Sequence, residues 1–139
     1  MNFSLEITIL VLFLAILQGS LPVAEAQPDG KGLFTAYCSP CHGKGAIGED
    51  PASPSGGFRD NGTLIAPALN GTAHAWHHGP EILFGYVKDG SPATESPMPG
   101  FSDKLMDDEI WSIIKYYQSL WPERIRKIYE KNYPGGFVE

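Results

Sequence analysis

The sequence predicts a small all-α fold, on the evidence of three stretches with helical periodicity and the lack of any alternating apolar and polar run. The chain has 139 residues, enough for one domain but not comfortably for two. Its 16 glycines and 12 prolines predict many loops between the helices. The formal net charge of -6 argues against a protein that binds nucleic acid, which would need a basic surface.

Each of the three helices has its own local signals. Residues 30–37 place Leu33, Phe34 and Tyr37 on one face. Residues 80–88 begin with Pro and Glu, which favour a first helical turn, and end before Asp89-Gly90. The strongest helix spans residues 107–120 and carries one apolar stripe. Met106 precedes its acidic first turn, and because Met is not a capping residue, we expect the N-cap at Asp107.

The N-terminus has the pattern of a secretory signal. Residues 7–17, "ITILVLFLAIL", are apolar except for Thr8 and are shorter than the roughly 20 residues of a membrane span. Small residues in "VAEA" suit a cut after Ala26, although residues 2–6 carry no Lys or Arg. We therefore expect residues 1–26 to be a signal peptide and the mature chain to be periplasmic or otherwise exported. It would have no stable membrane span, whereas an uncleaved signal would anchor it.

Both cysteines lie in the stretch "AYCSPCHGKG", two residues apart, with a histidine directly after the second. A Cys38–Cys41 disulfide would close a tiny loop and constrain little of the unfolded chain. A redox-active dithiol would need a following helix, and zinc would need more ligands nearby. The pattern Cys-x-x-Cys-His is typical of covalent haem c attachment, with Cys38 and Cys41 bonded to the porphyrin and His42 as an axial iron ligand.

A second axial ligand is expected at Met98, which lies between Pro97 and Pro99. Prolines stiffen such a loop, and a thioether opposite a histidine raises the potential of haem iron. A lone Met can instead fill a gap in a core. Rival ligands are His74, His77 and His78, which alternatively form a separate metal site or point to solvent; their role is left open.

Residues 29–121 resemble the class I c-type cytochromes, which carry one haem. Four stretches carry the resemblance: "GKGLFTAYCSPCHG", "APALNG", "SPMPGF" and "DDEIWSIIKYYQSLW". The resemblance implies a small cytochrome c fold, with three to five helices wrapped around one covalently attached haem. It also implies that the closing helix crosses the first near Gly30. The predicted domains are the signal peptide, the cytochrome domain at 27–121 and a C-terminal extension at 122–139.

Further roles for single residues follow from the same resemblance. The Pro67 carbonyl is expected to accept the N–H of the His42 ring, and Leu69 to pack on the haem. Trp76 and Tyr86 are expected either to reach the haem propionates or ring, or to be ordinary aromatic core. The extension is expected to dock a partner or to fold back on the domain.

The expected function is one-electron transfer between exported redox proteins, by a low-spin haem with His42 and Met98 as ligands and without enzymatic activity. One alternative is a cytochrome subunit of a dehydrogenase or oxidase complex. Another is a haem enzyme or gas sensor with a labile sixth ligand. The sequence does not identify the electron donor or acceptor.

Export is tested by sequencing the N-terminus of protein purified from a secreting host. Cleavage after Ala26 predicts that the mature chain begins at Gln27. A purified chain that retains residues 7–17 would instead show that the apolar segment remains as an anchor.

Overall fold

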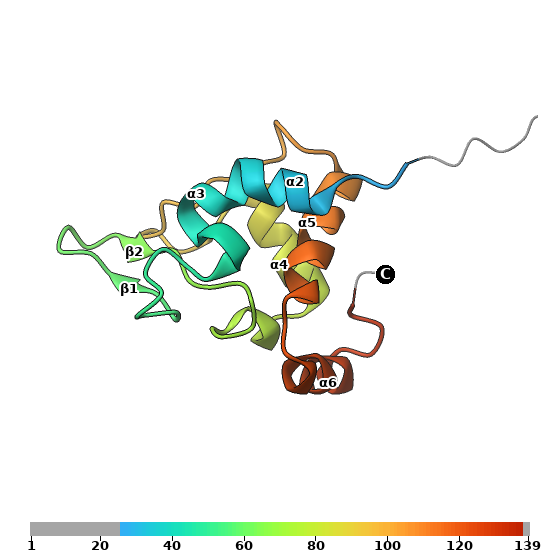
Figure 1. The fold of residues 1–139 in the computed structure, drawn as a ribbon. Helices are drawn as coiled ribbons and strands as arrows, with labels where there is room; N and C mark the ends of the chain where they lie inside the picture. The colour runs from blue at the N-terminus through green and yellow to red at the C-terminus, as the bar shows by residue number, and fades with distance from the viewer. Residues whose placement is uncertain (1–25, 138–139) are drawn as a thin grey trace, which may run out of the picture.

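The structure is a computed structural model that describes residues 26–137. The predicted signal peptide, apart from Ala26, lies outside the described residues. The described part is mostly helical, with one small antiparallel sheet (Figure 1). Its α-helices are α2 (Gly30–Leu33), α3 (Ser39–His42), α4 (Pro80–Asp89), α5 (Asp107–Ser119) and α6 (Glu123–Asn132). Shorter helical segments are η1 (Phe34–Cys38), η2 (Lys44–Ala46) and η3 (Ala75–His77).

Among residues 26–137, no helix combines the length and the apolar character that crossing a membrane requires.

The first helical stretch is longer than predicted, because α2, η1 and α3 follow one another from Gly30 to His42. The Asp29 carboxylate caps its start by accepting the Gly32 N–H at 3.0 Å. The middle segment, η1, is π-helical, a widening of the helix that is frequent at functional sites. The stretch ends at Gly43, whose φ of +73° suits glycine. One helical stretch therefore carries both cysteines and His42.

The predicted second and third helices are present as α4 and α5, but the N-cap of α5 differs from the prediction. Met106 is the N-cap, with an extended backbone, and Asp107 is the first helical residue. The Glu109 carboxylate accepts the Met106 N–H at 2.9 Å. The expectation of a cap at Asp107 is therefore wrong. The Glu109 carboxylate, at the third helical position, accepts a backbone N–H at the start of the helix, so the N-cap residue does not have to be a typical capping residue.

The sheet was not predicted and corrects the expectation of a purely α-helical fold. Strands β1 (Gly57–Phe58) and β2 (Leu64–Ile65) pair antiparallel, with Gly57 opposite Ile65 and Phe58 opposite Leu64. Two residues per strand are too few to show an alternating pattern, which needs four or more. Their hairpin closes with the Arg59 N–H donating to the Thr63 carbonyl at 2.8 Å.

Helices α2 and α5 cross closely, as the resemblance implies (Figure 1). A Cβ placed on Gly30 would lie 1.9 Å from the Ser112 carbonyl oxygen, so no larger residue fits without movement. One turn further along both helices, the rings of Phe34 and Tyr116 lie 5.3 Å apart. The prediction that the closing helix crosses the first at Gly30 is confirmed, with the Ser112 backbone as the contact.

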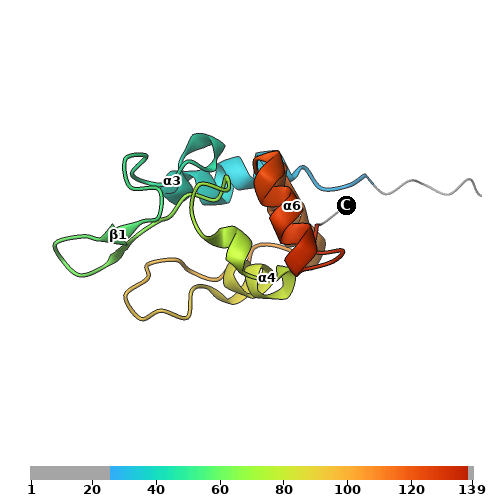
Figure 2. The same cartoon turned by 90° about the horizontal axis from the view of Figure 1, so that it is seen from below.

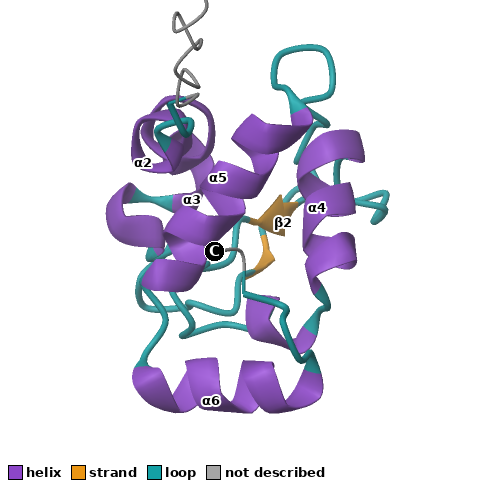
Figure 3. Ribbon diagram, turned by 90° about the vertical axis from the view of Figure 1, so that its right-hand side faces the viewer, coloured by secondary structure: helices purple, strands orange, loops and turns teal. Residues whose placement is uncertain are grey.

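The C-terminal segment folds back on the rest of the chain. Helix α6 lies across one end of the other helices (Figures 2 and 3). Trp121 stacks edge-on against buried Tyr129 at 4.9 Å, and its indole N–H donates to the Leu69 carbonyl at 2.8 Å. The Tyr133 hydroxyl donates to the His77 carbonyl at 2.6 Å. Of the two expected roles, the described structure shows the folded-back helix.

Replacing Gly30 with Ala is expected to destabilise the holoprotein by about 1–3 kcal/mol, because the new Cβ must displace the backbone of α5. Thermal unfolding followed by circular dichroism measures this. The matched control is Gly85→Ala in α4, where a Cβ meets nothing within 4 Å. That control is expected to be neutral or to stabilise by up to ~1 kcal/mol through helix propensity. Equal melting temperatures for the two variants would contradict a close crossing.

Candidate functional site

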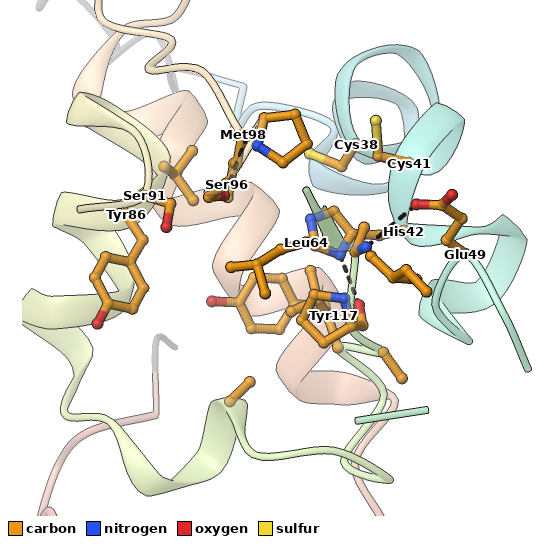
Figure 4. Close-up of a pocket in the computed structure, with 18 of the residues that line it drawn as sticks. Cys38, Cys41, His42, Glu49, Leu64, Tyr86, Ser91, Ser96, Met98 and Tyr117 are labelled. Carbon is orange, nitrogen blue, oxygen red and sulfur yellow. Dashed lines mark hydrogen bonds between the residues drawn. The ribbon is translucent and has the colours of Figure 1, made fainter. Parts of the chain in front are cut away.

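A cavity of about 460 Å³ lies between the first helical stretch, the β1–β2 hairpin, α4 and α5. Its walls are mostly apolar, as is usual for sites that hold a small molecule or cofactor. Figure 4 shows Cys38, Cys41 and His42 on one side and Met98 on the other. The residues expected to bind or contact the haem all line it: Cys38, Cys41, His42, Pro67, Leu69 and Met98.

The imidazole of His42 is buried and held by one hydrogen bond. Its Nδ1 lies 2.7 Å from the Pro67 carbonyl oxygen, and because a carbonyl only accepts, Nδ1 carries the proton. Burial lowers the pKa of His42, while the Pro67 carbonyl and Glu49 act in the opposite direction. A neutral ring with an unprotonated Nε2 is the form of histidine that ligates a metal.

The loop after His42 places Pro67 beneath the ring. The Gly48 N–H donates to the His42 carbonyl at 2.8 Å, and the Ala46 carbonyl accepts the Leu69 N–H at 2.8 Å. Gly48 has a φ of +89°, and a Cβ there would lie 2.9 Å from the Ala68 nitrogen. The two segments therefore approach as closely as glycine allows, and this approach puts the Pro67 carbonyl within reach of His42.

Both cysteines of the chain are free thiols in the structure, with Cys38 half-buried and Cys41 exposed. Burial, followed by the charge of Cys41, raises the pKa of Cys38 to about 12. Redox-active dithiols depend on a thiolate with a lowered pKa, so this environment opposes that use. The three-residue spacing on a helix instead turns both thiols toward the same cavity.

Met98 lies on a loop whose two ends meet at the C-terminus of α4. Gly90 pairs with Pro99, and the Ser91 N–H donates to the Met98 carbonyl at 3.3 Å. A Cβ on Gly100 would lie 2.7 Å from the Lys88 carbonyl oxygen, so glycine is required at this point. We call the place where Gly90 and Gly100 bring the two ends of the loop together the neck of the loop. The neck was not recognised in the sequence, although two glycines ten residues apart flank the loop. It holds the half-buried Met98 at the cavity wall.

The three histidines after the hairpin divide into two groups. His74 and His78 line the cavity, whereas His77 packs against Trp76 with ring centroids 3.8 Å apart. Among residues 26–137, no three His, Cys, Asp or Glu side chains come together in a way that could hold a separate metal ion. The alternative of a surface metal site therefore has no support there. Tyr86 also lines the cavity, whereas Trp76 does not.

A charged pair at the cavity wall was missed by the sequence analysis. The Arg59 guanidinium donates to the Glu49 carboxylate, and this hydrogen bond is the main reason that the pKa of Glu49 is lowered. Arg59 also donates to the Leu64 carbonyl and to Thr63 Oγ1. Both residues lie in a Gly-rich loop without periodicity, so no pattern in the sequence indicates that they meet.

Comparison with known proteins agrees with this chemistry. Residues 25–116 match the family model described as cytochrome c oxidase, cbb3-type, subunit III. A thiosulfate dehydrogenase from Psychrobacter arcticus is 32% identical over 108 residues, which are 78% of this chain. The chain spans only 30% of that relative's length. No solved structure matches.

A cytochrome c domain implies haem c and the transfer of electrons, and the matches do not favour the alternatives raised by the sequence. The chain belongs to the c-type cytochromes.

Proposed function

We propose that this chain carries one haem c, attached through Cys38 and Cys41 and ligated by His42 and Met98, and passes single electrons between exported redox proteins. The observation that supports this proposal most is the convergence of these four sulfur and nitrogen donors on one apolar cavity. Two thiols, a neutral imidazole and a thioether are the groups that a low-spin haem c needs. The residues present therefore fit the group.

The protein's part is to hold both ligands still. When bound, the haem supplies the one-electron couple of its iron. The Pro67 carbonyl fixes the ring plane and the tautomer of His42, while Pro97 and Pro99 restrict the backbone around Met98. Leu69 contributes to the apolar wall. Ligands that keep their positions in both oxidation states make electron transfer fast, because little has to rearrange.

We propose a carrier rather than an enzyme because His42 and Met98 together leave no coordination site for a substrate. The relative named as a thiosulfate dehydrogenase is much longer than this chain, so its activity is not carried over with the matched part. For this chain, the match supports electron transfer with other redox proteins as partners.

The proposed location follows from the predicted signal and the family. Cytochromes of this type are typically exported, and residues 1–26 have the pattern of a secretory signal. We propose a periplasmic mature chain with a cytochrome domain at 27–121 and an extension at 122–139. The packing of Trp121 against Tyr129 makes that extension a support for one end of the domain.

Covalent attachment predicts that acid–acetone leaves the haem on the purified protein and that no free thiol remains. Each thiol S–H adds across a vinyl group, so both cysteines are consumed. Cys38→Ala is expected to keep one bond and to lower the yield of holoprotein, whereas the double variant with Cys41→Ala should release its haem into the solvent. Mass spectrometry and thiol titration measure both. Two free thiols in the mature holoprotein would contradict the proposal.

Ligation by Met98 predicts the weak sulfur-to-iron charge-transfer band in the far-red spectrum of the oxidised protein. Met98→Ala is expected to lose this band, to become partly high-spin, to bind carbon monoxide when reduced, and to drop in potential. The matched control is Met106→Ala, because the Met106 side chain is 65% exposed and lies outside the cavity. That control should keep the band and resist carbon monoxide.

Rapid binding of carbon monoxide by the unmodified protein, unchanged in Met98→Ala, would contradict the carrier. The sixth position would then be vacant or held by a weaker ligand, and a haem enzyme or sensor would explain the site better.

A further inference from the structure

His74 and His78 form a pair at the cavity wall that electron transfer through His42 and Met98 does not use. Their rings lie edge-to-face with centroids 5.9 Å apart, and the His78 ring lies 5.5 Å from that of Tyr86. His74 is exposed and His78 is half-buried. The pair therefore connects the cavity to solvent and can exchange protons with it.

Among the side chains that line the cavity, His74 and His78 are the ones that can supply a positive charge not already paired with a carboxylate. Apart from His42, the charged or readily protonated side chains that line it in the described part of the chain are Glu49, Arg59, His74 and His78. Arg59 and Glu49 form an ion pair and largely cancel. A cofactor that brings negative charge into this cavity would therefore meet its main free compensation at the two histidines.

A haem c brings that negative charge as two carboxylates, which lie on the edge of the macrocycle opposite the two thioether carbons. In Figure 4, the yellow-green turn that contains η3 lies at the opposite end of the cavity from Cys38 and Cys41. His74 and His78 flank this turn. A haem attached at the cysteines would have its carboxylates directed toward the histidine pair, and a carboxylate buried there without a compensating charge would be costly.

We propose that His74 and His78 are a proton-binding site at the carboxylate edge of the haem, and that this site takes up a proton when the iron is reduced. The inference rests on the proposed function, since it needs the attached haem. One electron arrives from the redox partner and one proton from solvent. No other bond is made or broken.

The direction of the effect follows from electrostatics. Reduction removes one positive charge from the iron, so a histidinium nearby is less strongly repelled and reduction favours uptake of the proton. The potential therefore falls as pH increases through the range where the pair titrates. Histidines titrate between about pH 5 and 8, and a tenfold difference in proton affinity between the two redox states corresponds to about 59 mV.

Other groups near the pair set where it titrates. Burial, followed by the charges of His74 and His77, lowers the pKa of His78. Tyr86 faces it from α4, and Tyr133 of α6 bonds the His77 carbonyl. Arg59, Glu49 and Tyr117 line the same cavity. None of these neighbours supplies a negative charge that is free to hold a histidinium, so the haem carboxylates are the groups that would do so.

The test is a spectropotentiometric titration of the holoprotein at a series of pH values from about 5 to 8. The unmodified protein is expected to show a potential that falls with pH, and the double variant His74→Gln, His78→Gln a flat one. His77→Gln is the control for a neighbouring histidine outside the cavity, because its ring packs on Trp76. Loss of the His77 charge removes one cause of the lowered pKa of His78, so the slope should remain and move to higher pH. Imidazole proton NMR should show a higher pKa for His78 in the reduced state.

The outcomes separate this inference from the proposed function. A slope that persists in the double variant, or that His77→Gln removes equally, would overturn the histidine pair, as would a flat profile in an unmodified protein whose far-red band is intact. Absence of covalent haem would overturn both proposals. If the double variant does not incorporate haem, the single variants His74→Gln and His78→Gln, checked by the same band, decide: an unchanged slope in each would overturn the inference.

Discussion

The hydrogen bond between His42 and the Pro67 carbonyl is the contact on which the site depends. It joins residues 25 positions apart, fixes which ring nitrogen carries the proton, and leaves Nε2 free for the cavity. The intervening loop is constrained by this requirement. Gly48 must pass against the backbone of Ala68, and the Glu49 N–H must reach the Ala66 carbonyl, for Pro67 to arrive under the ring. Because His42 follows directly on Cys41, fixing the ring also fixes the positions of the Cys38 and Cys41 thiols.

The cavity itself is the second constraint, since a small chain cannot spare this much interior volume. Helix α5 contributes Ile110, Ile113 and Tyr117 to the packed core, and two of these, Ile113 and Tyr117, also line the cavity. The end of the domain away from α2 is closed by aromatic packing, where Trp121 meets Tyr129 and bonds the Leu69 carbonyl. That bond places the C-terminal segment directly behind the Pro67 loop. The proposed haem would fill this volume and complete the core, so that its attachment and the folding of the chain would stabilise each other.

The helices and the ligand motif were readable in the sequence because their signals are local. Cys38, Cys41 and His42 lie within five residues of one another. The apolar stripe of α5 is visible within one continuous segment of the sequence, residues 107–120. The missed features depend on contacts between distant segments or on elements too short for a period: the two-residue strands, the Arg59–Glu49 pair and the Gly90–Gly100 neck. The N-cap of α5 was misplaced for a related reason, because the capping carboxylate lies three residues beyond the cap. Position in the fold, rather than residue type, also separates His77 from His74 and His78.

The two kinds of charge at the cavity have different consequences for the proposed carrier, in which His42 and Met98 would hold the iron in both oxidation states. The Arg59–Glu49 pair keeps its net charge of about zero over the physiological range, because Arg stays protonated and the pKa of Glu49 is lowered. It would therefore shape the field around the proposed haem iron without responding to pH. The proposed proton-binding pair would respond, since histidine is the side chain whose ordinary titration lies closest to neutral pH. If the ligands do not exchange, electrostatics remains the means by which this chain can adjust its potential, and His74 and His78 are the residues placed to make that adjustment depend on pH.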